Sequence, residues 1–514
     1  ELWLKYGLAK TVKSGAFNRD LAMLFLARIF DLYLKPGGRL GFLLPFTVFK
    51  TQAGAGFREF LANKARIHVI HDMVTLYPFE GATNRTSAII IEKPCELADL
   101  GKDKCPGPRE LNEEVKRGIR HVIWTSKLGK GGIPSDMPLE DVLKVTDRYE
   151  AIMTPVIPDD VSSPWMQVTR DVLPAIRRLV SGPKYYEAHA GVLTELDQVY
   201  FIKILGKTPD GSLLITNPPE TRQKKHVRQV KVPIEPDLVY PLIRGRNVER
   251  WFVETSNEYI IVPHDPRTGK PLPETELKVK YPAAYGYLNQ YREELKKRSI
   301  KPFLSIRDKL KRVKTEREKK LIEAKLDENF YILDNTGPYI FTPYKVVWPV
   351  ITGAITGKAT SFACAVVEPI NDKYLGTRIV IPNAKLVLVP FQSADEAYYV
   401  AGVLNSVLVR SIVASYTIET EISTHVLDII KVPRFEPGNR LHRLIAALSR
   451  RAHAIARCIH ASQKPAYCGR IKDPVGELAR TEEWLDRVVG QLYGLSEDAI
   501  VEFRRLLAIL SGES

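Results

Sequence analysis

Helix-like and strand-like patterns alternate over residues 1–95, and this alternation restricts the fold more than any other feature of the chain. Apolar residues with a period of 3.6 indicate helices, and short apolar runs closed by turn residues indicate buried strands. The patterns predict helices over 17–35 and 54–63 and strands over 39–45, 67–76 and 87–93. We therefore predict the second half of an α/β sheet, in which the strand over 39–45 is buried and parallel.

Three regions of different character follow. Residues 96–165 are charged, rich in proline and glycine and weakly periodic, which predicts an inserted loop region or linker. Residues 166–435 carry many short β-branched or aromatic runs, which predict an α+β domain. Residues 436–514 become wholly helical, with Asn439 as the expected cap of the first helix.

The region 166–435 also contains a dense charged segment. We predict strands at 199–202, 259–262, 344–348 and 386–389. Between the second and third of these, the pattern over 306–326 predicts one helix in which basic residues predominate. Most such charge runs are solvated surfaces, so a solvated face and a DNA-facing surface both remain open.

The charge balance favours a polyanionic partner. The chain holds 75 Lys and Arg against 60 Asp and Glu, a net charge of +15. Nucleic acid fits better than a membrane, because phosphate contacts supply most sequence-independent affinity. A basic protein without such a partner is the alternative.

The cysteines and the apolar runs bear on the compartment. The five cysteines are scattered and odd in number, without a CxxC pair, so we predict neither a disulfide framework nor a zinc or other metal site. The longest apolar run, 40–49, is too short for a membrane span and is broken by Pro45. Without a signal peptide, we expect a cytoplasmic protein. Because the chain opens at Glu1 without a methionine, we also expect an upstream part that was removed or lies on another chain.

Three stretches within residues 1–95 together resemble a known family. They are Asp20–Phe25 with Leu34–Pro45, Phe57–Leu61, and Leu76–Glu80 followed by the strand at 87–93. In this order and spacing they resemble motifs V to VIII of the DNA adenine-N6 methyltransferases that place target recognition after catalysis. The resemblance implies that 1–95 is the C-terminal half of a Rossmann-like methyltransferase domain.

Segments further along resemble the same enzymes, especially the large restriction-modification and phage-defence types. They are Leu242–Phe252, Tyr281–Ser299, Tyr344–Pro349, Val400–Arg410 and Glu421–Pro433. All are similar to recurrent elements of the C-terminal recognition domain, which implies that residues 166–435 bind double-stranded DNA.

The resemblance implies methyl transfer from S-adenosylmethionine to N6 of an adenine that is flipped out of the duplex. The glycine loop that holds S-adenosylmethionine and the NPPY motif should stand before residue 1. Asn217-Pro218-Pro219-Glu220 is interpreted as a turn, because Glu220 stands where an aromatic ring should stack. This chain alone is therefore predicted to be incomplete and inactive.

By resemblance, three apolar residues have roles at the catalytic site. Phe79 would stack on the flipped adenine as the aromatic residue of motif VIII, and its alternative is a core position. Phe25 and Leu24 match the motif V region that lines the cofactor's adenine, and core packing is equally open for Phe25.

Five cations are candidate DNA contacts. Arginine suits bidentate recognition of guanine or phosphate. Three candidates lie close together beside Trp251, and two sit in segments that resemble the family: Arg244, Arg246 and Arg250, then Lys345 and Arg410. For each one singly, an exposed solvated charge is the alternative.

Two functions from different classes remain open. The first is part of a site-specific adenine methyltransferase whose other half belongs to the same polypeptide or to a separate subunit. The second is a non-catalytic DNA-binding specificity subunit that partners a methyltransferase or nuclease chain. An NPPY-type motif in the partner half would decide for the first.

Overall fold

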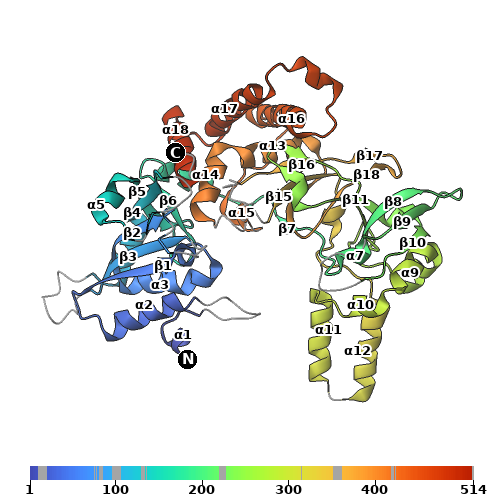
Figure 1. Cartoon of the computed structure of the whole chain (residues 1–514), viewed down its shortest axis with the longest axis horizontal. Coiled ribbons are helices and arrows are strands. Elements are labelled where there is room, and N and C mark those ends of the chain that lie inside the picture. The colour runs from blue at the N-terminus through green and yellow to red at the C-terminus, as the bar shows by residue number, and fades with distance from the viewer. Residues whose placement is uncertain are drawn as a thin grey trace.

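The computed structural model describes most of the chain. Its described residues are 1–9, 20–74, 76, 78–79, 85–94, 106–128, 133–134, 136–218, 227–313, 315–350, 362–417, 422 and 424–511. The chain starts with the short helix α1 (Leu2–Lys5) beside a sheet at one end of the molecule and crosses to a strand-rich region at the other end. It returns through helices that pack near both (Figure 1).

The first sheet has six strands in the order β1-β3-β2-β4-β5-β6. Its strands are β1 (Arg39–Pro45), β2 (Arg66–Met73), β3 (Thr86–Glu92), β4 (Ile119–Ser126), β5 (Thr146–Pro155) and β6 (Trp165–Val168). Because β3 runs antiparallel to both β1 and β2, these two strands are parallel to each other. They therefore end at the same edge of the sheet.

Two helices pack on the sheet: one precedes β1 and the other connects β1 to β2. The helices α2 (Leu21–Leu32) and α3 (Ala55–Lys64) bury residues such as Leu26 and Phe57 in the core beside the sheet. Asp20 caps α2, because its carboxylate accepts a hydrogen bond from the backbone N–H of Ala22. The helices and strands predicted for residues 1–95 are confirmed with small shifts of their ends, while residues 17–19 lie outside the described part.

The prediction that the strand over 39–45 pairs with a parallel neighbour is wrong. Within the described residues, β1 pairs only with the antiparallel β3 and forms the edge of the sheet. Its Leu43 side chain is 49% exposed. The apolar run correctly indicated a strand, but hydrophobicity does not report strand direction.

The prediction of a loop region or linker over 96–165 is also wrong. This stretch contributes β4, β5, the start of β6, α4 (Pro108–Arg117) and α5 (Leu139–Lys144), so the first sheet continues past residue 95. The charged residues that hid the strand pattern stand at exposed positions of β5, such as Arg148 and Glu150. Charge on the solvated face of an antiparallel pair is compatible with a strand.

The strand-rich region contains two larger sheets and two small ribbons. The larger sheets are β10 (Lys231–Ile234)-β9 (Leu213–Thr216)-β8 (Phe201–Lys207)-β14 (Tyr259–Ile261)-β11 (Val239–Ile243)-β19 (Ile381–Pro382) and β16 (Ala365–Val367)-β15 (Tyr344–Pro349)-β20 (Leu386–Phe391)-β7 (His189–Ala190). The ribbons are β12 (Val248–Glu249)-β13 (Phe252–Val253) and β17 (Ile370–Asp372)-β18 (Gly376–Arg378). Three of the four predicted strands are confirmed, whereas 199–202 is split between the short helix α7 (Asp197–Tyr200) and β8.

Helices connect these sheets to one another and to the first sheet. They are α6 (Leu173–Leu179), α8 (Glu274–Lys280), α9 (Pro282–Asn289), α10 (Arg292–Lys296), α11 (Lys301–Arg312), α12 (Glu316–Glu328), α13 (Ala394–Asn405), α14 (Val407–Tyr416) and α15 (Val426–Ile429). The single charged helix predicted over 306–326 is two helices, α11 and α12. Thr315 caps the second by accepting a hydrogen bond from the backbone N–H of Glu318.

The C-terminal region is helical, as predicted. It consists of α16 (Arg440–His460), α17 (Pro474–Leu492) and α18 (Glu497–Ser511). Asn439 caps α16 as expected. One hydrophobic core joins these helices to α13, α14, β5 and β6. Among the described helices, none alone is long and apolar enough to span a membrane; α13 and α14 meet that test only as a pair bent by 58°.

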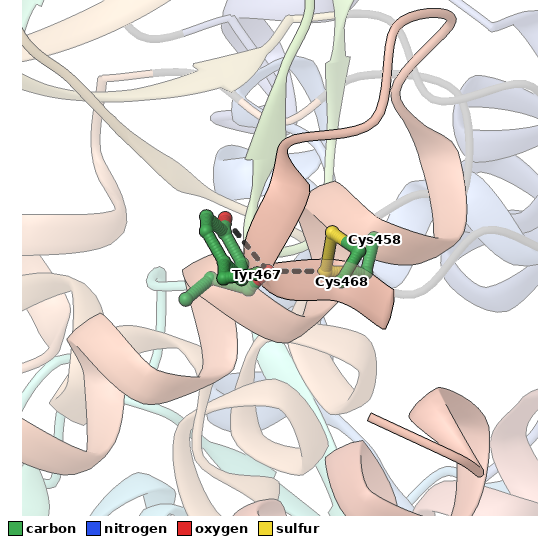
Figure 2. The surroundings of a disulfide bond; sticks show 4 residues. Cys458, Tyr467 and Cys468 are labelled. Atoms are coloured by element: carbon green, nitrogen blue, oxygen red, sulfur yellow. Dashed lines mark hydrogen bonds between the residues drawn. A yellow bond between two sulfur atoms is a disulfide. The ribbon is translucent and has the colours of Figure 1, made fainter. Parts of the chain in front are cut away.

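A disulfide closes the loop between α16 and α17 (Figure 2). Cys458, in the last turn of α16, bonds to Cys468, ten residues further along. The hydroxyl of Tyr467 donates a hydrogen bond to the carbonyl of Ala454, which holds the returning chain against the helix. The scattered cysteines gave no indication of this pair, because its proximity depends on the turn after α16.

Removing this disulfide should destabilise the helical region. Closing a loop of this length stabilises a fold by about 2–3 kcal/mol, chiefly by restricting the unfolded chain. We expect the Cys458→Ser, Cys468→Ser double variant to unfold at a lower urea concentration than the oxidised wild-type chain. Wild-type chain in reducing buffer serves as the control and should match the variant. Equal midpoints for all three samples would contradict this account.

Candidate functional site

The candidate catalytic site lies where β1 and β2 end. In open α/β sheets, ligands bind at the carboxyl ends of parallel strands. Pro45 ends β1 there, and the chain after β2 passes through Phe79 before β3 begins. The first described residue after the gap at 80–84 is Arg85, which leads directly into β3.

A buried ion pair fixes this edge. The Asp72 side chain is fully buried, and its carboxylate pairs with the guanidinium of Arg85, with one N–O distance of 2.6 Å. Burial raises the pKa of Asp72, but the charges and hydrogen bonds of Arg85 and His121 together outweigh this effect and hold the pKa at about 2. The amide of Gln167 donates to the same carboxylate at 2.6 Å and contacts the buried His121 ring at 2.7 Å.

The ring of Phe46, the residue after Pro45, lies between two cations. The Arg85 guanidinium is 4.5 Å from the ring centroid, and the Lys50 ammonium is 5.0 Å from it. Lys50 also donates hydrogen bonds to the carbonyls of Trp165 on β6 and Ser415 on α14. Burial lowers the pKa of Lys50 well below its usual value. The edge of the first sheet is thereby attached to the C-terminal helices.

Phe79 lies at this edge with its side chain 49% exposed. The exposure excludes the alternative of a core phenylalanine. Its neighbours Tyr77 and Glu80, part of the same sequence motif, lie outside the described residues. Phe79 is therefore available to contact a ligand, and its stacking role stays a prediction.

The two residues predicted to contact the cofactor differ in exposure. Phe25 is 58% exposed on α2, so it packs in no core of the described residues, and its contact with the cofactor stays a prediction. Leu24 is partly buried and packs against the core beneath the first sheet. Leu21 and Leu32 are exposed on the same helix, so its exposed surface is partly apolar.

The structure groups Arg244 with Arg246 but not with Arg250. Both guanidinium groups pair with the carboxylate of Glu258, at 3.5 Å for Arg244 and 2.6 Å for Arg246. The Arg244 guanidinium also lies 5.2 Å from the ring centroid of Phe201. Arg246 is the more exposed of the two.

Arg250 and Arg410 belong to a second cluster. The Arg250 guanidinium pairs with Glu482 at 3.1 Å and donates to the carbonyl of Asn405, and that of Arg410 donates to the carbonyl of Phe362. Burial raises the pKa of the Cys364 thiol, and the positive charges of both arginines oppose this effect. Arg250 stays beside Trp251, with its guanidinium 5.7 Å from that ring centroid, but its partners differ from those of Arg244 and Arg246.

The prediction of Lys345 as a DNA contact is wrong. Its side chain is completely buried in β15, between β16 and β20, and its ammonium donates to the carbonyl of Thr342 at 2.5 Å. Burial lowers the pKa of Lys345 to about 7. The family-like segment correctly indicated a strand, but not that both faces of this strand are covered.

The interpretation of Asn217 as part of a turn is supported. The residue is buried, its amide nitrogen donates to the carbonyl of Arg228, and its amide oxygen accepts from the N–H of Val230. Its side chain is thus occupied by the backbone of the loop that returns to β10. Pro219 and Glu220 lie outside the described residues.

Sequence reasoning missed Lys50, Asp72 and Arg85. The only signal was Asp72 itself, an acidic residue in the otherwise apolar end of a strand. Buried charges are rare unless they are paired, so such a residue predicts a partner without naming it.

No protein-family model and no curated protein matches the chain. Among solved structures, it is similar to the type IIL restriction-modification enzyme MmeI in complex with DNA, at 11% identity and a TM-score of 0.49, over 96% of this chain and 52% of that chain. For the type IIG restriction endonuclease BpuSI, the identity is 12% and the TM-score 0.25, over 95% of this chain and 52% of that chain. A third similar structure is a nuclease-deletion mutant of the type ISP restriction-modification enzyme LlaGI in complex with a DNA substrate mimic. Its identity is 11% and its TM-score 0.36, over 88% of this chain and 32% of that chain.

The chain thus spans about half of MmeI and BpuSI and about a third of that LlaGI chain. Identities and TM-scores this low transfer neither a function nor a detailed fold to it.

Replacing Lys345 should change how stability depends on pH. The folded-state pKa of about 7 lies below the usual 10.5, so the unfolded chain binds an additional proton between these values. Wild-type stability therefore gains from this group as pH rises from about 7 towards 10.5, and the gain amounts to a few kcal/mol. Lys345→Met removes that gain.

Urea unfolding across this pH range would measure the free energy of unfolding of both proteins. The value for Lys345→Met should exceed that of wild type by the largest amount near pH 7. Its advantage should shrink as pH rises. A difference that does not vary with pH would show that Lys345 titrates normally and is not buried.

Proposed function

We propose that the chain is part of a site-specific DNA adenine-N6 methyltransferase of the restriction-modification or phage-defence kind. In this proposal the first sheet supplies one wall of the catalytic pocket, and the strand-rich region binds the target duplex. One observation carries it: Phe79, the residue that the sequence resemblance assigns to stacking on the flipped base, is half exposed at the carboxyl edge of two parallel strands.

The chemistry needs alignment more than a nucleophile. The lone pair of adenine N6 is delocalised into the ring, and the atom is hidden in the duplex, so the base must be extruded and held. S-adenosylmethionine would supply the methyl group. In this chain Phe79 would hold the extruded base by stacking, and the Asp72–Arg85 ion pair would anchor the end of the loop that carries it.

The first sheet also has room for another strand. Within the described residues, β1 uses one of its two hydrogen-bonding edges, and the apolar face at Leu21 and Phe25 lies uncovered beside it. The free edge of a strand presents unpaired backbone N–H and C=O groups that can pair with another chain. We propose that β1 pairs with the part of the methyltransferase that carries the NPPY motif and most of the S-adenosylmethionine site, in the same polypeptide or on a separate subunit. Phe25 and Leu24 would then line the cofactor.

A non-catalytic specificity subunit is the second candidate. It is favoured by the polar side chains at the candidate site, because Asp72, Arg85 and Gln167 bond to one another. Such a network fixes structure without requiring a substrate. The two functions share the DNA-binding region and differ in whether Phe79 is needed.

The full chain should bind duplex DNA with a strong dependence on salt. If several cations neutralise phosphates, the logarithm of the binding constant falls linearly with the logarithm of salt concentration, by about 0.9 per contact. Fluorescence anisotropy of wild type, Arg246→Ala and Arg120→Ala would measure these slopes. We expect Arg246→Ala to lose about one contact, because Arg246 is an exposed cation of the proposed DNA-binding region. Arg120, which is equally exposed and also pairs with a glutamate but lies on the first sheet, serves as control. A folded chain that binds no duplex even at low salt would contradict the proposal.

Phe79→Ala should impair base extrusion without impairing the fold. Stacking on an extruded base is worth about 1–3 kcal/mol, so the loss should reach roughly tenfold or more in methylation when the NPPY-bearing part is present. A fluorescent adenine analogue in the target would report less extrusion, and Phe79→Trp should retain it. If Phe79→Ala leaves both signals unchanged while DNA still binds, the specificity-subunit function is the correct one.

A further inference from the structure

The most isolated part of the molecule is a two-helix arm made of α11, residues 313–315 and α12. Figure 1 shows it standing out from the strand-rich region. Of its helical residues only Phe303, in the first turn of α11, is buried, and α12 has no buried residue. At a rise of 1.5 Å per residue each helix is about 18 Å long, roughly half a turn of B-DNA. The arm adds almost nothing to the core.

The base of the arm is nevertheless firmly held. The guanidinium of the fully buried Arg298 donates hydrogen bonds to four backbone carbonyls at 2.7–2.9 Å. The acceptors lie before and after the arm and in a distant loop: Leu295, Phe330, Ile332 and Thr194. These bonds fix both chain ends of the arm, so its direction is set by the body of the protein.

Further ion pairs tie α10 to the end of α12. The Asp327 carboxylate pairs with the guanidinium of Arg292 at 2.7 Å and with the ammonium of Lys296 at 3.0 Å. The pairing with Arg292 is the main cause that lowers the pKa of Asp327 to about 2. Arg292 and Lys296 at the base of the arm are therefore already paired within the protein.

Cations near the tip are different. Lys311 and Lys319 pair with acids three residues earlier in their own helices. Four others form no ion pair or side-chain hydrogen bond with any described residue: Lys309, Arg312, Arg317 and Lys320. They form two pairs with i, i+3 spacing, so each pair shares one face of its helix.

We propose that the tip of this arm binds the phosphate backbone of duplex DNA that flanks the recognition sequence. The proposal rests on the DNA-binding function proposed above and extends it to a surface outside the candidate site. Unpaired Lys and Arg on an exposed helix suit phosphates, and a contact of this kind positions the duplex without reading bases. In Figure 1 the arm and helices α2 and α3 lie on the side of the molecule opposite α16 and α17.

The test is a variant in which the four tip cations are replaced by glutamine. Glutamine keeps the helix propensity of lysine and arginine, and the replaced side chains support no core, so the arm should stay folded. Anisotropy of the full chain on a random-sequence duplex of about 40 bp, roughly four helical turns, would be followed over a salt series. We expect binding to weaken at least tenfold at low salt and the salt slope to fall by up to about 3.6.

The matched control is a variant that loses four positive charges from the first sheet region instead of from the arm. The four replaced cations each pair with a carboxylate: Lys116, Arg120, Lys127 and Lys144. Replacing them by glutamine should leave the affinity and the slope near the wild-type values. Duplexes selected from a random library should carry the same sequence for wild type and the tip variant.

The outcomes separate the arm from the wider function. If wild type binds duplex DNA and the tip variant behaves like the control, the arm proposal is overturned and the arm must serve a protein partner. A tip variant that selects a different sequence also overturns it, because the arm would then read bases. If wild type binds no duplex, the proposed function itself fails.

Discussion

The ammonium group of Lys50 bridges parts of the chain that are far apart in sequence. It donates hydrogen bonds to the carbonyl of Trp165, which begins β6, and to that of Ser415, which lies on α14. A buried cation is costly unless its donors are satisfied, so β6 and α14 must keep their relative position. The hydrophobic core shared by β5, β6 and the C-terminal helices acts in the same direction. These contacts fix the position of the first sheet, which carries the candidate site, relative to the C-terminal helices.

What the sequence could predict follows from the range of the interactions. The strand at 39–45 and the helix that Asn439 caps depend on residues within a few positions, and both were predictable. Lys345 depends on strands that cover it from either side, and Arg298 on carbonyls up to 104 residues away. The strands β4 and β5 were missed because charged residues on a solvated face imitate a loop. Local patterns thus predicted elements well, whereas the partners of buried charges could be found only in the folded chain.

The same distinction applies to the candidate site and the DNA surface. The resemblance selected Phe79 and Phe25, and the structure leaves both rings exposed. It could not sort the arginines, because pairing with Glu258 or Glu482 depends on loops that meet in space. Charge therefore divides into two kinds in this chain. Cations such as Arg292 and Arg298 stabilise the fold, while four cations at the tip of the arm pair with no described residue and, in our proposal, contact phosphates.

The most direct test of the central claim is a cryo-electron microscopy structure of the full chain with the NPPY-bearing part, a target duplex and S-adenosylhomocysteine. Our account predicts an adenine extruded from the duplex, with its ring stacked on Phe79 at the carboxyl edge of β1 and β2. It also predicts that the backbone of the same duplex contacts the strand-rich region. An intact, fully stacked duplex that touches only the strand-rich region, with Phe79 facing solvent, would contradict the methyltransferase assignment.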